Sequence, residues 1–239
     1  MATFLLVHGA WHGAWCWRKL IPALEARGHR GIAFDLPGHG EDRTPPGDVT
    51  LEAYAQKTVA MLDGLSEPPM LVGHSMGGMV ISAAAERRPA GVKRLVFLCA
   101  GLMKSGETLL DTLADDAGSL LNEAMEPSAD GLGLVLKPER VREVFYADCG
   151  DADVADAIAR VCQQASAPVA VPLTLTSANF GHVLRDYIVC KQDRAISPER
   201  RRDMIADSPC DRVIEIDRGH SPFLSAPDEL ADILVSLAR

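Results

Sequence analysis

The stretch MLVGHSMGGMVISAAAERRP at residues 70–89 decides the fold. It opens with a short apolar run at 70–72, passes through the pattern Gly-x-Ser-x-Gly around Ser75, and continues as small apolar residues until Pro89 stops it. This order predicts a strand, a very tight turn and a helix. Such a turn needs glycine on either side of the serine, because the backbone packs closely there. We therefore expect Ser75 to stand exposed above the carboxyl end of a strand.

The rest of the chain alternates short apolar runs with segments of helical spacing. Besides 70–72, strands are predicted at 3–7, 31–34, 95–99, 187–190 and 213–216. Strands that alternate with helices pair in parallel, and helices then cover both faces of the sheet. The sequence therefore predicts an α/β protein with a mostly parallel, doubly wound sheet of about six strands.

Several helices are expected between these strands. They cover residues 17–26, 51–65 and 75–88, a segment after Ser197-Pro198, and a segment after Ser225 and Asp228. Thr50 is the predicted N-cap of the second helix, and Ser197 with Pro198 reads as an N-cap followed by proline at the first helical position. Ser225 and Asp228 have the spacing of a capping box ahead of the last helix.

Residues 102–182 interrupt the alternation. They contain no convincing core strand and instead show helical spacing, for example between Val154 and Val161. The insertion falls at the carboxyl ends of the strands, where ligands bind in sheets of this kind. The sequence therefore predicts a core of residues 1–101 and 183–239 with 102–182 inserted as a helical cap. An extra helical layer far from any site is the alternative.

Ser75 is the expected nucleophile, and a serine hydroxyl needs a base to activate it. For a nucleophile on such a turn, the acid and then the histidine follow later in the chain. Of the seven histidines, only His182 and His220 come after the insertion begins. His220 follows the strand at 213–216, so its loop lies at the same edge as Ser75, and it is the predicted base. His182 has no strand beneath it, which favours a surface or cap-lining role.

Asp193 is the predicted acid, because it comes just after the strand at 187–190. Its role is to orient the imidazole and to stabilise the imidazole cation. Two other carboxylates compete with it. Asp217, three residues before His220, reads as a turn residue, and Asp186 precedes the strand instead of following it.

The oxyanion that forms during such a reaction needs two backbone N–H donors. Met76 directly follows the nucleophile and is expected to supply one. The loop His8-Gly9-Ala10 follows the first strand, and Ala10 is the predicted second donor. A plain structural turn is the alternative interpretation of His8-Gly9. This chemistry implies neither a metal nor an organic cofactor.

Three stretches together carry a family resemblance. FLLVHGAWHGAW at 4–15, LVGHSMGGM at 71–79, and YIVC at 187–190 leading to Asp193 resemble the methylesterase and hydroxynitrile lyase family of α/β-hydrolases. That family includes plant methylesterases and bacterial carboxylesterases, among them pyrethroid hydrolases. The resemblance covers essentially the whole chain and is weakest at 102–182. The tandem HGAW is its most specific part, and the resemblance implies the α/β-hydrolase fold.

The family divides into esterases and lyases. Its cyanohydrin-cleaving members typically carry Thr where this chain has Gly9, and Lys directly after the catalytic histidine, where this chain has Ser221. Without that lysine, no cation is evident to stabilise departing cyanide. The resemblance therefore implies a serine carboxylesterase that hydrolyses small to medium, apolar esters through an acyl-enzyme. A hydroxynitrile lyase or other carbon–carbon cleaving enzyme is one alternative. A non-catalytic small-molecule receptor is another, against which the intact set of Ser, His and Asp argues.

Composition excludes several other classes of protein. The chain has 239 residues, of which 47% are hydrophobic, enough for one domain with a large core. The formal net charge of −9 argues against a nucleic-acid surface. The basic run at 200–202 reads as a solvated helix face. The apolar start is too short for a signal peptide or a membrane span, and the six cysteines lack zinc spacing. We expect a cytoplasmic monomer or homodimer with free thiols.

Overall fold

The computed structural model describes residues 1–114 and 116–239. Its central sheet contains β1 (Thr3–Val7), β2 (Arg30–Ala33), β3 (Met70–His74), β4 (Arg94–Leu98), β8 (Arg185–Cys190) and β9 (Arg212–Ile216). The order across the sheet is β2-β1-β3-β4-β8-β9, and each neighbouring pair is parallel. The expected parallel sheet of about six strands is confirmed. The strand that leads to Ser75, β3, lies in its interior, where both edges are paired.

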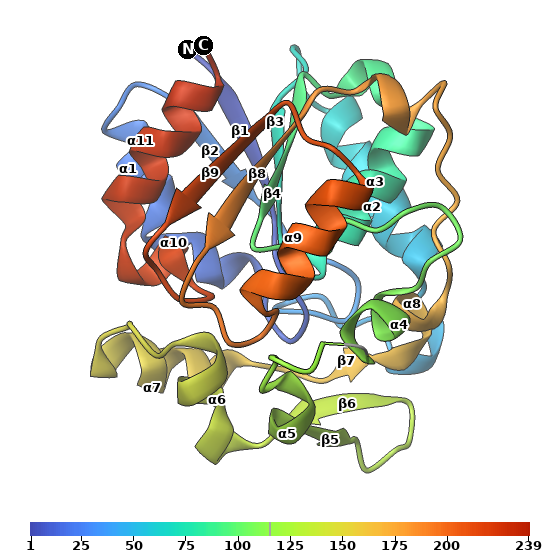
Figure 1. Ribbon diagram of the computed structural model, residues 1–239, viewed down its shortest axis with the longest axis vertical. Helices are drawn as coiled ribbons and strands as arrows, with labels where there is room; N and C mark the ends of the chain where they lie inside the picture. The colour runs from blue at the N-terminus through green and yellow to red at the C-terminus, as the bar shows by residue number, and fades with distance from the viewer. Residues whose placement is uncertain (115) are drawn as a thin grey trace.

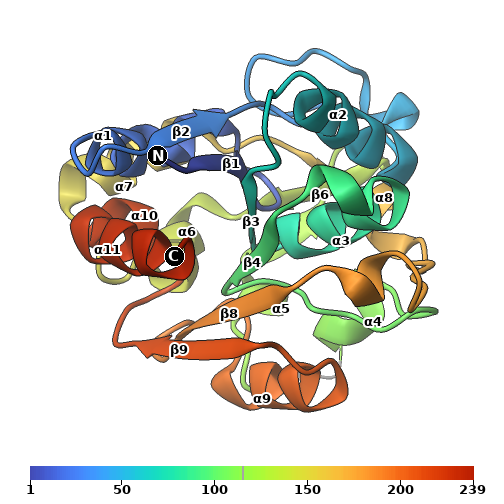
Figure 2. The same ribbon diagram turned by 90° about the horizontal axis from the view of Figure 1, so that it is seen from above.

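Helices cover both faces of the sheet (Figure 1). Seen from above in Figure 2, α1 (Leu20–Glu25) and α11 (Pro227–Leu237) lie on one side, and α2 (Leu51–Asp63) and α3 (Gly77–Arg87) lie on the other. α9 (Pro198–Asp207) packs beside β8. The remaining short pieces of this part are α10 (Pro222–Ser225) and the 3₁₀ turns η1 (Ala14–Arg18), η2 (Pro46–Asp48) and η3 (Pro89–Gly91). Among the described helices, none combines the length and apolar character needed to cross a bilayer.

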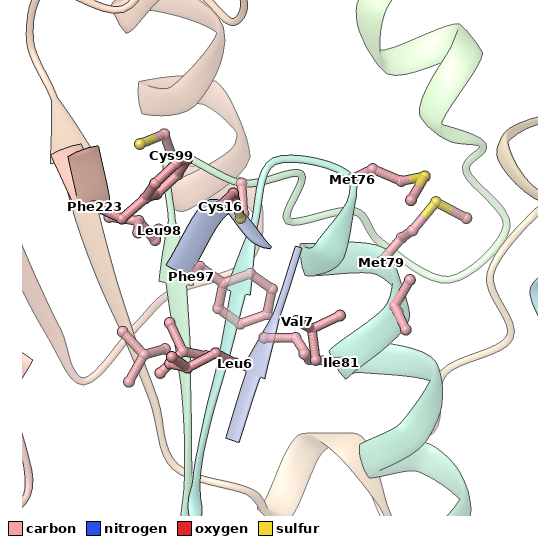
Figure 3. Packing of buried hydrophobic residues seen from close by; sticks show 14 of the residues in the cluster. Leu6, Val7, Cys16, Met76, Met79, Ile81, Phe97, Leu98, Cys99 and Phe223 are labelled. Atoms are coloured by element: carbon pink, nitrogen blue, oxygen red, sulfur yellow. The ribbon is translucent and has the colours of Figure 1, made fainter. Parts of the chain in front are cut away.

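The core lies between the sheet and these helices. Side chains from β1 and β4 meet residues of α3 there, as Figure 3 shows for Val7, Phe97 and Ile81. All five residues of β3 are buried. Burial on both faces explains why β3 reads as a continuous apolar run and not as an alternating one.

Two predicted helix starts are confirmed. The Thr50 hydroxyl accepts a hydrogen bond from the Ala53 amide at 3.0 Å, and α2 begins at the next residue. The Ser197 hydroxyl accepts from the Arg200 amide at 3.1 Å, with proline in the first turn of α9. Both caps satisfy an amide that would otherwise have no partner at a helix start.

Two other helix predictions are wrong in detail. The expected helix at 17–26 is a 3₁₀ turn followed by the shorter α1, because Pro22 has no N–H to bond back into the preceding turn. The expected capping box at Ser225 does not form. Ser225 ends α10, its hydroxyl donates to the Asp148 carboxylate at 3.0 Å, and α11 begins only at Pro227.

The inserted segment lies across the carboxyl ends of the central strands, below them in Figure 1. Its elements are α4 (Leu109–Ala114), α5 (Leu121–Ala124), β5 (Met125–Pro127), β6 (Gly133–Leu136), α6 (Pro138–Phe145), α7 (Asp151–Arg160), β7 (Gln164–Ala165), α8 (Ser166–Ala170) and the 3₁₀ turn η4 (Phe180–His182). β5, β6 and β7 form an antiparallel sheet, so the segment is not purely helical as expected. Strands this short leave no detectable alternation in the sequence.

Candidate active site

The turn between β3 and α3 presents Ser75. Its φ is +54°, in the left-handed region that residues other than glycine rarely adopt. Hydrogen bonds fix the turn from both sides. The Ser75 amide donates to the Leu98 carbonyl at 3.2 Å, and the Ser75 carbonyl accepts from the amides of Gly78 and Gly101, each at 3.0 Å. Backbone strain persists where such surrounding bonds hold it, and it is common at active sites.

The two glycines of the motif allow this turn to pack closely, as its spacing predicts. A Cβ on Gly73 would lie 2.5 Å from the Gly77 carbonyl oxygen. A Cβ on Gly77 would lie 2.7 Å from the Val7 carbonyl oxygen at the end of β1. Because both distances are shorter than a methyl group tolerates, the turn can touch β1 only with glycine at these positions.

His220 and Asp193 are brought into contact by the loops after β9 and β8. His220 Nδ1 lies 2.6 Å from Asp193 Oδ2, and both side chains are fully buried. Asp193 Oδ1 accepts from the amides of Ala195, at 2.7 Å, and Ile196, at 3.2 Å. A carboxylate accepts from Nδ1, so the other ring nitrogen, Nε2, is the one free to act as a base. Among the described residues, His220 Nε2 has no hydrogen-bond partner.

Asp193 is held in its ionised form. Burial alone raises the pKa of this carboxyl, but the guanidinium of Arg201 and the hydrogen bond from His220 outweigh burial and hold the pKa below its usual value. An ionised carboxylate at Nδ1 keeps the imidazole in one tautomer and one orientation.

His74, the residue before the serine, ties the His220 loop to the turn. Its ring centroid lies 4.5 Å from that of His220, and its Nε2 donates to the His220 carbonyl at 2.9 Å. Burial, together with the nearby His220, lowers the pKa of His74 well below its usual value, so this ring is neutral. Ser75 Oγ and His220 Nε2 are not hydrogen-bonded to each other in the structure. Catalytic hydrogen bonds are often long in free enzymes and tighten when substrate binds.

Ala10 and Met76 line the same pocket as Ser75. Within the described part of the chain, neither amide donates to a protein acceptor. Buried amides are nearly always paired, so two unpaired N–H groups beside a nucleophile suit an incoming anion. Gly9 brings the two loops together, because a Cβ there would lie 2.8 Å from the Cβ of Ser75.

The pocket above Ser75 is narrow and apolar, with an open volume of about 30 Å³. Apart from Ser75 and Gln164, its walls are apolar or aromatic: Ala10, Trp11, Met76, Leu109, Leu110, Leu113, Leu121, Met125, Leu134, Val169 and Ile196. Gln164 is fixed in the wall, since its amide oxygen lies 3.0 Å from His39 Nε2 and its amide nitrogen donates to the Tyr54 hydroxyl at 3.2 Å. A larger hollow, of about 560 Å³, lies near the amino terminus around Met1 and contains none of the predicted catalytic residues.

A second buried histidine connects the loop after β1 to the inserted segment. His12 Nδ1 donates to the Ala10 carbonyl at 2.6 Å, so its Nε2 accepts, and the Tyr146 hydroxyl donates to it at 2.5 Å. Burial lowers the pKa of His12 to about 4, which keeps it neutral. The Trp11 indole also reaches across, donating to the Leu134 carbonyl in β6 at 2.9 Å. The sequence did not indicate the roles of Tyr146 or Gln164, because both lie in the part with the weakest pattern.

The competing candidates lie elsewhere. Asp217 is exposed and accepts from the Gln192 side chain at 3.0 Å, as expected of a turn residue. Asp186 is buried but paired with Arg94 and Arg212 at the amino end of β8. His182 is exposed, and its Nδ1 donates to the Ser177 carbonyl at 2.7 Å.

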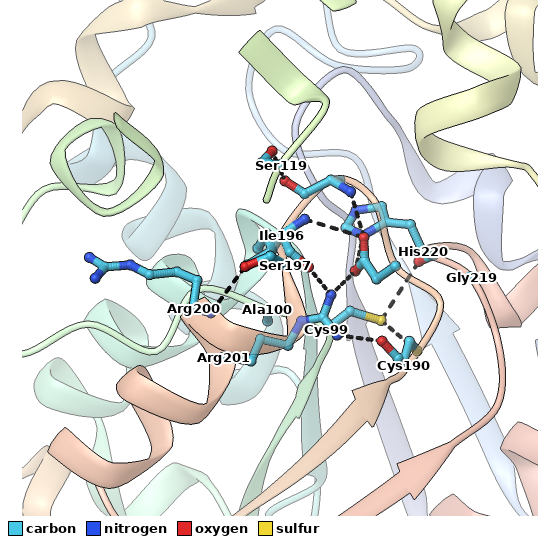
Figure 4. Close-up of polar contacts among 12 residues, drawn as sticks. Cys99, Ala100, Ser119, Cys190, Ile196, Ser197, Arg200, Arg201, Gly219 and His220 are labelled. Carbon is cyan, nitrogen blue, oxygen red and sulfur yellow. Dashed lines mark hydrogen bonds and ion pairs between the residues drawn. The ribbon is translucent and has the colours of Figure 1, made fainter. Parts of the chain in front are cut away.

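The sequence predicted that the basic run at 200–202 forms a solvated helix face. The structure contradicts this for Arg201. Arg201 is fully buried and lies 2.5 Å from Asp193 Oδ2, whereas Arg202 is exposed and pairs with Glu199. Figure 4 shows Arg200 pointing away from the site and Arg201 pointing into it. Successive residues of a helix point about 100° apart, so one member of such a run can face the core.

One group of side chains could be mistaken for a metal site. Donor atoms of His74, Cys99 and His220 lie within 4.8 Å of one another. However, His74 Nε2 already donates to a carbonyl and His220 Nδ1 already binds Asp193. Burial raises the pKa of the Cys99 thiol, which disfavours the thiolate that a metal needs. The group packs around the imidazole and does not form an open coordination site.

Comparisons with known proteins agree over nearly the full length. Residues 4–233 match the model of the alpha/beta hydrolase family. Methylesterase 9 of Arabidopsis thaliana is 32% identical over an alignment covering 100% of this chain and 98% of the relative. Esterase PIR7B of Oryza sativa subsp. japonica is 33% identical, with coverages of 99% and 95%. The solved structure of the pyrethroid hydrolase PytH is 28% identical, with a TM-score of 0.84 and coverages of 99% and 97%.

Proposed function

This chain belongs to the alpha/beta hydrolase family and, within it, to the methylesterases and esterases, and we propose that it hydrolyses carboxylic esters through an acyl-enzyme formed on Ser75. The chain is a carboxylic ester hydrolase, as its relatives' names indicate. The observation that carries the mechanism is the convergence of three features at one edge of the sheet. They are the strained serine, the His220–Asp193 pair, and two unpaired amides.

The acylation step follows from these positions. Ser75 Oγ attacks the ester carbonyl while His220 Nε2 takes the hydroxyl proton. The carbonyl oxygen becomes an oxyanion, which the amides of Ala10 and Met76 bind. Asp193 stabilises the imidazolium through Nδ1. The tetrahedral intermediate then collapses, His220 gives its proton to the leaving alcohol, and the acyl group stays on Ser75.

Deacylation repeats the sequence with water. His220 Nε2 takes a proton from the water that attacks the acyl carbonyl, and the same two amides bind the second oxyanion. Collapse of that intermediate breaks the bond to Ser75 Oγ, and His220 returns its proton to the serine. The acid is released, and the enzyme returns to its starting state.

The pocket supports an apolar substrate of small to medium size. Its walls are mostly leucine, methionine and tryptophan side chains, so an aliphatic or aromatic group is favoured over a charged one. A cavity of about 30 Å³ holds little more than one water molecule, so even a modest ester requires the side chains of the inserted segment to move. Several lining residues come from that segment, among them Leu113, Leu121 and Met125.

A lyase activity is not favoured. Ser221, the residue after His220, is fully buried and uncharged, so it provides no cation for departing cyanide. Gly9 leaves no room for a threonine, because its Cβ position is 2.8 Å from the Cβ of Ser75 and 3.0 Å from His74 Nδ1. Both positions that distinguish the lyases therefore carry the esterase pattern.

The first test compares initial rates on p-nitrophenyl acetate for the wild type and Ser75→Ala. We expect a fall of roughly 10³-fold or more, as is typical when such a nucleophile is removed. Ser236→Ala is the matched control, since Ser236 is an exposed serine that only donates to the Ile233 carbonyl. Circular dichroism of each variant checks the fold. Esterase activity that survives in Ser75→Ala would exclude this mechanism.

Assembly and location extend the proposal. We expect a monomer or homodimer that acts in the cytoplasm on a small-molecule ester. All six cysteines are free, which fits a reducing compartment. Light scattering measures the mass of the particle, and a larger assembly would contradict the first part.

A further inference from the structure

A buried arginine shares the catalytic acid with the base. Arg201 Nη2 lies 2.5 Å from Asp193 Oδ2, the same oxygen that His220 Nδ1 approaches to 2.6 Å. The three side chains are fully buried. Figure 4 shows Arg201 entering this cluster from α9. A group that is positively charged at all working pH values therefore touches the carboxylate that is to stabilise the imidazolium.

The charge of Asp193 is balanced before His220 takes up a proton. In a triad without such a neighbour, the carboxylate is an uncompensated negative charge beside the imidazole and favours its protonated form. Here the guanidinium neutralises that charge and also repels a second cation at the same oxygen. Because the cluster is buried, solvent screens this repulsion only weakly.

We propose that Arg201 is a positioning residue that fixes Asp193 as a carboxylate and weakens the proton affinity of His220, so that the base stays unprotonated and active at lower pH. This inference rests on the proposed function of His220 and Asp193. It assigns to α9 a role in setting the working pH of the enzyme.

The neutral groups around His220 do not produce this effect. His74 packs on its ring, and His12 lies close enough to interact with it, but burial lowers the pKa of both, so neither is charged. The Phe145 ring lies 5.4 Å from the imidazole. The Cys99 sulfur lies 3.7 Å from the His220 carbonyl, and burial raises the pKa of its thiol.

The other charged groups lie farther along the His220 loop. Asp148, between α6 and α7, accepts from the Gly219 amide at 2.9 Å and from the Ser225 hydroxyl at 3.0 Å, and it does not contact the imidazole. Arg218 is paired with Glu229 of α11 at 2.7 Å, near the protein surface. Among the described residues, Arg201 is thus the cation in contact with the His220–Asp193 pair.

Arg201 also has structural bonds, so its two roles must be separated. Its Nη1 donates to the Cys190 carbonyl at 2.5 Å, and its Nη2 donates to the Ile196 carbonyl. These bonds hold the loop that carries Asp193. A purely structural role predicts lower activity at every pH with an unchanged profile, whereas the electrostatic role predicts a displaced profile.

The experiment is the pH dependence of kcat/KM for p-nitrophenyl acetate in the wild type, Arg201→Gln, Arg201→Met and Arg201→Lys. We expect the acid limb to move to higher pH by about one unit in the two neutral variants. Lys keeps the charge and is expected to restore the limb towards the wild-type position. A smaller amount of folded enzyme lowers kcat/KM without moving the limb, provided that the folded fraction is the same at every pH, which circular dichroism of each variant across the pH range checks. Arg202→Gln, an exposed arginine on the same helix, is the matched control and is expected to leave the limb unchanged.

A second readout does not need turnover. NMR titration of ¹⁵N-histidine-labelled Ser75→Ala protein follows His220 directly, and adding Arg201→Gln is expected to raise the His220 midpoint by about one unit. An unchanged midpoint, or equal loss of activity at all pH values in the Gln, Met and Lys variants, overturns the role of Arg201. Absence of ester hydrolysis in the wild type would instead count against the proposed function, while the titration still decides the question for Arg201.

Discussion

Gly9 lies where the loop after β1 packs against Ser75. A Cβ at this position would lie 2.8 Å from the Cβ of Ser75, 3.0 Å from His74 Nδ1 and 3.2 Å from the His74 carbonyl oxygen. The Ser75 Cβ and the His74 carbonyl oxygen belong to the tightly packed turn and cannot move without disturbing it. The Ala10 amide can therefore approach Ser75 only because residue 9 has no side chain.

Gly9→Ala is accordingly expected to displace the Ala10 amide and to reduce kcat/KM about tenfold to a hundredfold, because misplacements near 1 Å have effects of this size. Steady-state kinetics on p-nitrophenyl acetate measures it. Gly64→Ala is the control, since a Cβ there meets only ordinary contacts at 3.6 Å. If Gly9→Ala retains wild-type kcat/KM, the Ala10 amide does not contribute to the reaction.

The predicted catalytic residues and the buried arginine show what a sequence reveals at this scale. Ser75, Asp193 and His220 could be predicted because each follows a strand end, and strand ends meet at one edge of a parallel sheet. Arg201 could not, because its neighbours Arg200 and Arg202 make the run look uniformly solvated. Only the structure shows that Arg201 shares its helix face with the buried Met204.

At the scale of elements, Glu86 of α3 fastens the segment that returns from the insertion to β8. Its carboxylate accepts from the amide and hydroxyl of Thr176, at 2.8 and 2.7 Å, from the Asn179 side chain at 3.0 Å, and from the Phe180 amide at 3.1 Å. These four bonds outweigh burial and lower the pKa of Glu86, so it is ionised at neutral pH. One side chain thus closes a loop that has little regular structure of its own.

Glu86→Ala is expected to lower the free energy of unfolding by about 1–2 kcal/mol, the size expected for a partly exposed, charge-assisted cluster. Urea unfolding measures this loss. Chymotrypsin is expected to cut the variant faster at Phe180. Glu52→Ala is the control, because Glu52 makes only exposed side-chain contacts, with Arg87 and Gln56, and an exposed ion pair is worth less than about 1 kcal/mol. Equal stability and equal cleavage rates in both variants would show that the segment is held by other contacts.

The elements themselves were predictable to different degrees. All six central strands were found. Burial on both faces makes the interior strands β1, β3, β4 and β8 nearly continuous apolar runs, whereas the edge strands β2 and β9 are only partly buried. The small sheet of β5, β6 and β7 was missed because its strands hold three, four and two residues, too few for any period to show. The contact of Trp11 with β6 could not be predicted either, since it joins residues 123 positions apart.

At the scale of the whole molecule, the buried histidines set a limit on acid stability. Burial is the largest cause that lowers the pKa of His8, His12, His39 and His74. His8 and His12 are hydrogen-bonded as neutral rings, with one nitrogen donating and the other accepting. His8, for example, donates from Nδ1 to the Gly9 carbonyl at 2.8 Å and accepts from the Leu36 amide at Nε2 at 3.1 Å. A proton added to Nε2 would break the second bond and leave a charge in the core.

This arrangement predicts that stability falls as the pH drops below about 6.5, the ordinary pKa of histidine. Above that pH, these histidines bind no extra proton in either the folded or the unfolded chain, so the free energy of unfolding keeps its full value. Below it, the unfolded chain takes up protons that the folded chain refuses. For His12, with a folded pKa of about 4, the loss reaches about 3 kcal/mol across this window.

Urea unfolding at pH 7.5, 6.5, 5.5 and 4.5 measures this loss of stability. His12→Gln is expected to flatten the slope by up to about 1.4 kcal/mol per pH unit, while His182→Gln, at an exposed position, is expected to leave it unchanged. A free energy of unfolding that is the same at pH 7.5 and pH 4.5 would contradict the prediction.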